Sequence, residues 1–381
     1  MYDRKFSPNI SESYFIFGPR GTGKTSWLKA KYPNVPYFDL LEDDVRFDLG
    51  RSAKQLGKRI GPDYRGPVII DEIQKLPSLL DEVHRLIESR PGLQFILTGS
   101  SARKLKSQSV NLLAGRALIQ RMYPLTAEEL GADFQIEKAL LHGMLPKAWS
   151  TSHPVGYLKA YVQAYIDLEV KLEGLIRDLQ GFQRFLEAAS FSQGSVLNIS
   201  SVAQECGVER RTVSNYFEIL QDLLISYELP VFSKKAKRKL IQHQKFYYFD
   251  VGIYNTLRPQ GPLDSTESIQ GVSLETLVLQ EITAQISYRS LEYGIYFWRT
   301  QSQLEVDFIL YGKSGFIAIE VKLSSRLRQE DFEGLEAFLE DYPGAKGFLV
   351  YGGDRCFRQG PIEVIDAQTF FKKAGSIIQA R

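Results

Sequence analysis

Residues 14–25 are YFIFGPRGTGKT, an apolar run that leads directly into a glycine-rich loop. The pattern GxxxxGK[ST] is complete from Gly18 to Thr25, and the helix-forming run TSWLKAKY follows it. A buried strand, a glycine loop and a helix in this order are the context in which the motif binds a phosphate chain. The alternative is a glycine turn that carries Lys-Thr by chance, and the correct flanks on both sides argue against it.

The motif predicts a site for ATP with Mg²⁺. Its glycines let the backbone wrap closely around a phosphate chain, and N–H groups of the loop and of the helix N-terminus point at the β-phosphate. Lys24 is expected to reach the β- and γ-phosphates and to act in catalysis, and Thr25 is expected to hold Mg²⁺ through its hydroxyl. The loop residues predicted to bind the nucleotide are Gly18, Pro19, Arg20, Gly21, Thr22, Gly23, Lys24, Thr25 and Ser26.

Two further apolar strands are predicted, each ending in polar residues. Residues 67–70 (PVII) precede Asp71-Glu72, and residues 93–97 (LQFIL) precede Thr98 and Ser100. Carboxyl ends of parallel strands face the nucleotide crevice, so Asp71 is predicted to bind nucleotide and orient Mg²⁺ or its water. Glu72 is predicted to polarise the attacking water. Two solvated turn carboxylates are the alternative. Thr98 or Ser100 is a candidate sensor of the γ-phosphate and equally a candidate helix N-cap.

Composition narrows the class of protein. The chain has 381 residues, which favours two or three domains, and its net charge of +2 means that any nucleic-acid site must rest on a local patch. With two cysteines, Cys206 and Cys356, neither a disulfide framework nor a cysteine zinc site is indicated. The N-terminus lacks a secretory signal, and no apolar stretch approaches about 18 residues, so we expect a cytoplasmic protein without a membrane span.

The middle of the chain is predicted to be helical, with helices at 126–150 as a lid over the nucleotide and a helix-turn-helix near 200–220. The start of a recognition helix reaches the major groove, which makes Arg210 and Arg211 candidates for DNA contact. Strands on either side of a basic run would form a wing, whose charges would contact phosphate. Those charges are Lys234, Lys235, Lys237, Arg238 and Lys239. A protein-binding winged helix with a solvated basic loop is the alternative.

Three acidic residues and a lysine form a pattern in the last third. Glu275 lies in a helical run, Asp307 in an alternating strand, and Glu320-Val-Lys322 at the end of the strand GFIAIEVK. This order resembles the PD-(D/E)XK nuclease core. Asp307 and Glu320 would share a divalent metal, Lys322 would position or activate water, and Glu275 would complete the shell. The alternative is a nuclease fold kept for DNA binding or assembly, with the acidic residues satisfied by neighbours.

The chain as a whole resembles a family of prokaryotic AAA+ ATPases of the additional-strand, catalytic-glutamate class. These proteins carry a C-terminal winged helix and nuclease-like domain of poorly known function. The resemblance begins at VIIDEIQKLP (68–77), continues through FILTGSSARKL (95–105) and LLAGRALIQRMYPLTAEEL (112–130), and reaches WRTQSQLEVDFIL (298–310). It implies an α/β architecture with an AAA+ module at 1–150, a helical connector and winged helix at 151–260, and a restriction-endonuclease-like domain at 261–381.

The resemblance also implies partners. It indicates self-association into a ring, with a hexamer as one candidate, and Arg116 as the catalytic arginine supplied across a subunit interface. Arg103 is the competitor, and a surface salt bridge is the alternative for both. The leading hypothesis is an ATP-driven protein that processes or repairs DNA, duplex or branched. The rival is a STAND-like signalling or defence switch whose C-terminal region binds a protein and does not cleave DNA.

Overall fold

The computed structural model describes residues 2–8, 10–101, 117–166, 176, 178–262 and 264–379. Arg103 and Arg116 lie outside these residues. The chain forms two compact units. The N-terminal unit comprises Phe6–Pro124 with Asp222–Leu224, and the C-terminal unit comprises Met1–Lys5, Leu125–Gln221 and Ile225–Arg381. None of the helices in the described ranges combines the length and hydropathy that a membrane crossing requires.

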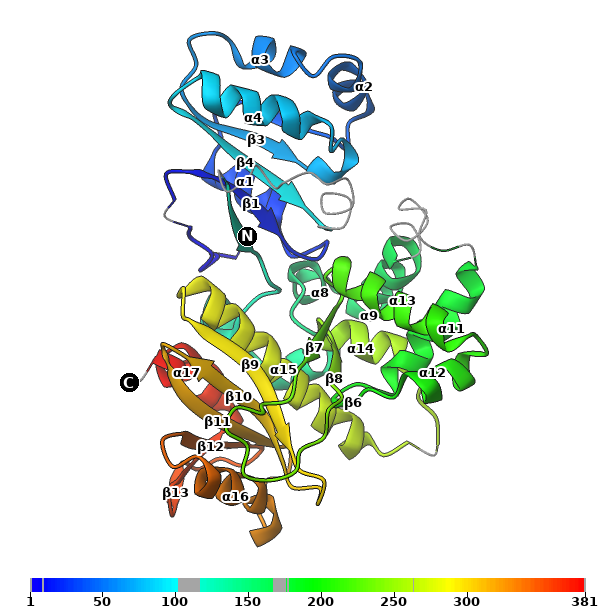
Figure 1. The fold of residues 1–381 in the computed structure, drawn as a ribbon, viewed down its shortest axis with the longest axis vertical. Helices are drawn as coiled ribbons and strands as arrows, with labels where there is room; N and C mark the ends of the chain where they lie inside the picture. The colour runs from blue at the N-terminus through cyan, green and yellow to red at the C-terminus, as the bar shows by residue number, and fades with distance from the viewer. Residues whose placement is uncertain are drawn as a thin grey trace. The chain divides into compact units, whose positions relative to one another are not determined.

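The N-terminal unit is built on a five-stranded parallel sheet with the order β2-β3-β4-β1-β5. Figure 1 labels its three central strands, β3, β4 and β1. Strand β4 lies between β1 and β3, as the additional-strand class requires. The three central strands confirm the predicted ones, and their burial explains their continuous apolar runs. The strands are β1 (Ser13–Phe17), β2 (Tyr37–Asp39), β3 (Gly66–Asp71), β4 (Leu93–Gly99) and β5 (Ala117–Arg121).

Helices cover this sheet and bury its apolar side chains in one core. The helix after the glycine loop, α1, begins at Lys24 and ends at Lys31. In α4 the buried residues recur at helical spacing, with Leu79, Leu80, Val83 and Leu86 all facing the core. Besides α1, the described residues of the unit form α2 (Asp43–Arg51), α3 (Gln55–Ile60), η1 (Ile73–Lys75) and α4 (Leu79–Ser89).

The helices predicted as a lid pack within the C-terminal unit. Helix α7 (Ile136–His142) lies against α14 (Val251–Leu257), where Asn255 Nδ2 donates to Leu140 O at 2.8 Å. Asp250, the N-cap of α14, also accepts from the backbone N–H of Met144. The lid role stays a prediction. The other elements of this region are α6 (Ala127–Leu130), η3 (Gly131–Asp133), α8 (Pro146–Ser150), α9 (Pro154–Ala160) and the π-helix η4 (Tyr161–Ile166).

A helix-turn-helix follows, formed by α12 (Ile199–Cys206) and α13 (Arg210–Asp222). Gly207 ends α12 with φ 68°, a left-handed conformation that glycine adopts without a steric penalty. Aromatic rings of α11 (Leu179–Ser190) pack on α13, so the aromatic run of α11 forms part of the core. The accompanying sheet has the order β6-β8-β7, with β6 (Ser195–Val196), β7 (Ser226–Leu229) and β8 (Lys245–Tyr248).

The C-terminal sheet has six strands in the order β13-β14-β12-β11-β10-β9. Helices α15 (Thr266–Tyr288) and α17 (Ala367–Gln379) pack on one of its faces, and α16 (Glu333–Asp341) packs on the other (Figure 1). Strands β9, β10 and β11 are antiparallel, and β12 runs parallel to β11. The strands are β9 (Tyr293–Arg299), β10 (Glu305–Gly312), β11 (Gly315–Lys322), β12 (Lys346–Tyr351), β13 (Phe357–Gln359) and β14 (Ile362–Asp366), with η5 (Gln329–Asp331) before α16.

Helix α15 carries a buried carboxyl group that titrates near neutral pH. Glu281 is 3% exposed and accepts hydrogen bonds from Ala127 N at 2.9 Å and Gln285 Nε2 at 2.8 Å. Burial raises its pKa from 4.5 to about 7. The folded protein therefore holds this proton more tightly than the unfolded chain. The resulting stability is complete below pH 4.5 and is lost as the pH rises through about 7.

We expect Glu281→Gln to remove this loss of stability with rising pH, because glutamine still accepts a hydrogen bond from Ala127 N and carries no titrating proton. Between pH 5 and pH 8 the parent chain should lose about 3 kcal/mol more free energy of unfolding than the variant. Urea titrations at both pH values measure the difference. The exposed Glu137→Gln is the control for loss of one carboxylate. Parallel pH curves for parent and Glu281→Gln would contradict the assignment.

Candidate nucleotide site and carboxylate cluster

The glycine loop has a backbone that only glycine fits at several positions. Gly21 and Gly23 have φ of 80° and 94°, in the left-handed region. A Cβ on Gly18 would lie 2.2 Å from Met122 O. The loop then enters α1, whose first N–H groups have no partner within the helix. The backbone of residues 18–25 is therefore shaped to receive an anion at a helix N-terminus.

Lys24 points back onto the loop that precedes it. Its Nζ donates to Gly18 O at 2.6 Å and to Pro19 O at 3.1 Å, and the side chain is buried. Thr22 Oγ1 also donates to Pro19 O, at 2.9 Å, which fixes the turn of the loop. These carbonyl oxygens hold the ammonium at the place where a phosphate chain would be cradled.

Asp71 connects the loop to two other strands. Its Oδ2 accepts from Thr25 Oγ1 at 2.7 Å and from the Tyr37 hydroxyl, and its Oδ1 accepts from the Thr98 hydroxyl. Burial, aided by the hydrogen bond to Asp71, raises the pKa of Tyr37, so this hydroxyl stays a donor. Hydroxyl and carboxylate oxygens are the donors that Mg²⁺ prefers, so Thr25 and Asp71 fit a magnesium site.

Glu72 has φ 58°, a left-handed conformation that is rare outside glycine. Its Oε2 accepts from Ser100 Oγ at 3.2 Å and from Gln74 Nε2, and Gln74 Nε2 lies 2.9 Å from Ser100 Oγ. Its backbone N–H donates to Thr98 Oγ1 at 3.0 Å. Both polar residues at the end of β4 thus face the acidic pair at the end of β3. Backbone strain of this kind is common at functional sites.

Two residues of this network, Tyr37 and Gln74, are not among the site residues predicted from the sequence. Tyr37 lies on β2, a strand of three residues that is too short for its apolar pattern to predict. Gln74 is 1% exposed and follows Glu72 by two residues, so its polar character within the run DEIQK was a signal that could have been used. Arg20 and Ser26, which are among the predicted nucleotide-binding residues, have exposed side chains.

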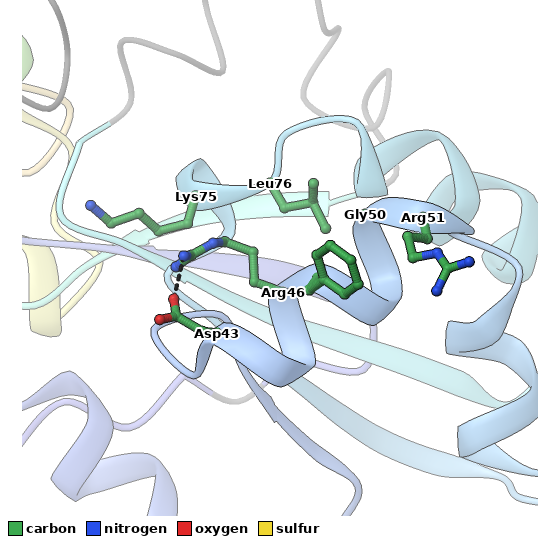
Figure 2. A pocket seen from close by; sticks show the side chains of 7 residues that line it. Asp43, Arg46, Gly50, Arg51, Lys75 and Leu76 are labelled. Carbon is green, nitrogen blue, oxygen red and sulfur yellow. Dashed lines mark hydrogen bonds and ion pairs between the residues drawn. The ribbon is translucent and has the colours of Figure 1, made fainter.

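A separate hollow of about 610 Å³ lies on the N-terminal unit, beside α2 (Figure 2). Figure 2 shows Arg46 pointing to Asp43, with which it forms an ion pair. The hollow shares no lining residue with the glycine loop or with the acidic pair, so its size does not bear on the nucleotide site. Its lining residues are Asp43, Arg46, Phe47, Gly50, Arg51, Lys75 and Leu76.

The C-terminal unit brings the four predicted nuclease residues together around a residue that was not predicted, Lys245. This lysine of β8 is 1% exposed. Its Nζ lies 3.1 Å from Glu275 Oε1 on α15 and 3.1 Å from Asp307 Oδ1 on β10, and it also pairs with Glu305. On β11, Lys322 Nζ lies 2.7 Å from Glu320 Oε1. We use the name carboxylate cluster for these residues together with the Tyr247 hydroxyl, which donates to Glu275. Its other members are Lys245, Glu275, Glu305, Asp307, Glu320 and Lys322.

The backbone completes the hydrogen bonding of the carboxylate cluster. Asp307 Oδ2 accepts from Val321 N at 3.0 Å, and Glu320 Oε2 accepts from Asp307 N at 3.3 Å. Burial is the largest cause that raises the pKa of Glu275 and Glu320, and the neighbouring Asp307 charge adds to it. Lys245 attracts these carboxylates and keeps a raised pKa despite its burial. The residues present therefore do not fit a divalent metal, because an ammonium group stands among its expected ligands.

Most of the predicted DNA contacts are exposed side chains. Arg210 and Arg211 are exposed at the start of α13, and Lys234, Lys235, Lys237 and Lys239 are exposed in the basic run. Arg238 is half-buried and pairs with Glu340 at 2.8 Å and Asp341 at 2.9 Å. Lys237 Nζ donates to Glu340 O at 3.4 Å, and Lys234 Nζ lies 4.4 Å from the centre of the Tyr311 ring.

The segment around the basic run follows the outer edge of β9. Phe232 N donates to Phe297 O at 2.7 Å, and Ile241 N donates to Arg299 O at 3.2 Å. In return, Phe297 N and Gln301 N donate to carbonyls of Pro230 and Lys239. The segment 230–241 is therefore held on the C-terminal sheet at both of its ends.

Family models match three successive parts of the chain. Residues 11–131 match an AAA domain, residues 133–264 match a domain of unknown function (DUF8612), and residues 270–370 match another domain of unknown function (DUF4143). No curated protein matches the chain. The first match agrees with the parallel sheet, the glycine loop and the acidic pair described above.

Several solved structures share a distant likeness. The Aeropyrum pernix ORC1 protein in complex with DNA is 16% identical, over 65% of this chain and 86% of that chain, with a TM-score of 0.24. The Thermotoga maritima RuvB Holliday junction branch migration motor is 17% identical over 57% and 82%, with a TM-score of 0.29. The ADP form of A. pernix ORC2 is 15% identical over 70% and 89%, with a TM-score of 0.30. At such TM-scores these likenesses carry no argument about this chain.

Proposed function

Because residues 11–131 form an AAA-type P-loop domain, we propose that the chain binds ATP with Mg²⁺, hydrolyses it, and uses the reaction to process DNA bound by its C-terminal unit. One observation carries the ATPase proposal. The carboxylates of Asp71 and Glu72 lie at the end of β3, hydrogen-bonded to Thr25 of the loop and to Thr98 and Ser100 at the end of β4.

The side chains have distinct roles in this proposal. Thr25 and Asp71 would hold Mg²⁺, which would neutralise phosphate charge when bound. Lys24 would exchange the carbonyls of Gly18 and Pro19 for β- and γ-phosphate oxygens. Glu72 would accept a proton from the water whose oxygen attacks the γ-phosphorus, as the bond to the bridging oxygen breaks and ADP leaves. Ser100, with Gln74, would hold the Glu72 carboxylate in place.

The DNA part of the proposal is supported by exposed cations in the C-terminal unit. Arg210 and Arg211 are the first residues of α13, and the first residues of a recognition helix are those that reach the major groove. The exposed lysines of the basic run would contact phosphate. We also propose that the chain forms a ring-shaped oligomer, in which Arg116 would contact the nucleotide bound by a neighbouring subunit.

Removing the exposed lysines should weaken DNA binding and its dependence on salt. For Lys235, Lys237 and Lys239 replaced together by alanine, the slope of log K against log salt should fall by about one unit for each phosphate that the protein no longer neutralises. Titrations of duplex and four-way junction DNA at several salt concentrations measure this slope.

The matched control removes three lysines that are exposed elsewhere in the same unit, Lys346, Lys372 and Lys373. Its slope should stay at the parent value if the basic run binds phosphate. Equal slopes for parent, test variant and control would show that the run is a solvated loop.

A second candidate function is a nucleotide-timed switch whose C-terminal unit binds a protein. The pairing of Arg238 with Glu340 and Asp341 favours it, because this pairing leaves less positive charge for phosphate. Comparing the ATPase rate with no DNA, duplex, single-stranded and four-way junction DNA separates the two functions. A rate that no DNA changes, together with no salt-dependent DNA affinity, would favour the switch.

A further inference from the structure

We propose that Lys245 is the resident cation of the carboxylate cluster, and that the C-terminal fold is therefore built without a hydrolytic metal. The ammonium would take the place in which a nuclease of this type holds its divalent ion. This inference does not rest on the proposed ATPase or DNA function, because it concerns only contacts within the C-terminal unit.

The geometry places the ammonium at the centre of the acidic side chains. Lys245 Nζ contacts Glu275 of α15 and Asp307 of β10, two of the three predicted metal ligands, and it also contacts Glu305 of β10. An ammonium carries three donors, and these three carboxylates use all of them. The third predicted ligand, Glu320 of β11, pairs with Lys322. In the part of the chain that the structure describes, no group of three or more acidic, His or Cys residues is arranged to hold a metal ion.

The charges of the cluster are nearly balanced by protein groups alone. Four carboxylates meet three cations, since Lys322 pairs with Glu320 and Arg299 pairs with Glu305 at 3.1 Å. Carboxylates this close repel each other unless a cation lies between them. Lys245 supplies that cation for Glu275, Glu305 and Asp307, and the phenol of Tyr247 also donates to Glu275.

Lys245 cannot easily withdraw to admit a metal. Its backbone lies in β8, the central strand of its sheet, paired with Val196 of β6 on one side and Leu229 of β7 on the other. The side chain is almost fully buried, beside the Phe297 ring. Displacing the ammonium would require breaking this sheet or leaving a buried charge without a partner. The lysine therefore also fastens the helix-turn-helix region to the C-terminal sheet.

The test follows thermal unfolding of the full chain without nucleotide, with and without Mn²⁺. In the parent chain and in Asp307→Asn, we expect the same response to Mn²⁺, because the cluster does not bind the ion in either. A Mn²⁺ stabilisation of the parent that Asp307→Asn removes would overturn the proposal. This comparison holds even if every Lys245 variant fails to fold.

Lys245→Met keeps the length of the side chain and removes its charge. We expect its melting temperature to fall by about 10 °C, and Mn²⁺ to recover part of this loss. Adding Asp307→Asn to Lys245→Met should abolish the recovery. The control is Lys313→Met, which removes a lysine from an exposed pair with Glu292 and should leave the melting temperature unchanged.

Two results with Lys245→Met would contradict the proposal. A variant that melts like the parent would show that the cluster does not need this cation. A variant that melts lower and gains nothing from Mn²⁺ would show that the ammonium does not stand at a metal position.

Discussion

Glu72→Gln is expected to bind Mg²⁺-ATP as the parent does and to hydrolyse it slower by roughly 10²-fold or more. Glutamine keeps the size of the side chain and can accept a hydrogen bond from Ser100, but it cannot take a proton from the attacking water. Nucleotide affinity and single-turnover hydrolysis are measured separately, so that a loss of chemistry is distinguished from a loss of binding.

The matched control is Glu88→Gln, at the exposed end of α4 in the same unit, which should hydrolyse ATP at the parent rate. Gln74→Ala adds a useful comparison, because it frees the Glu72 carboxylate from one donor while keeping the base itself. Hydrolysis by Glu72→Gln at the parent rate would remove this residue from the role of base.

Lys24→Ala should weaken nucleotide binding by roughly 10²-fold and leave no measurable hydrolysis, because the phosphate chain loses the cation that the loop holds for it. Titration with a fluorescent ATP analogue measures the first effect, and phosphate release measures the second. The exposed Lys31→Ala, in the same helix, removes an equal charge and should change neither. Affinity within a few-fold of the parent would mean that Lys24 only shapes the loop.

The N-terminal unit was largely predictable because its motif is local. A complete glycine loop fixes the backbone of about eight neighbouring residues, and the strands that end at Asp71 and Gly99 are largely apolar. Tyr37 could not be predicted, since it reaches Asp71 only because β2 pairs with β3. Pairing between residues 32 positions apart leaves no trace in a local pattern.

In the C-terminal unit the pattern predicted the acidic residues and missed the residue that decides their chemistry. The spacing of Glu320 and Lys322 places both side chains on one face of β11, as the structure has them. Lys245 begins β8, a strand that follows the basic run, and its position among carboxylates 30 to 62 residues away depends on tertiary packing. The pairing of Arg238 with Glu340 and Asp341 was hidden for the same reason.

The segment 230–241 has a consequence for any attempt to divide the chain. Its backbone supplies hydrogen-bond partners to the outer edge of β9, and Phe232 packs into the aromatic core beneath the sheet. A fragment that begins at residue 261 would lack both this segment and Lys245. It would present an unprotected edge strand, the feature by which one chain recruits the next into aggregates. Solubility of the isolated C-terminal fold thus depends on a stretch that precedes it in the sequence.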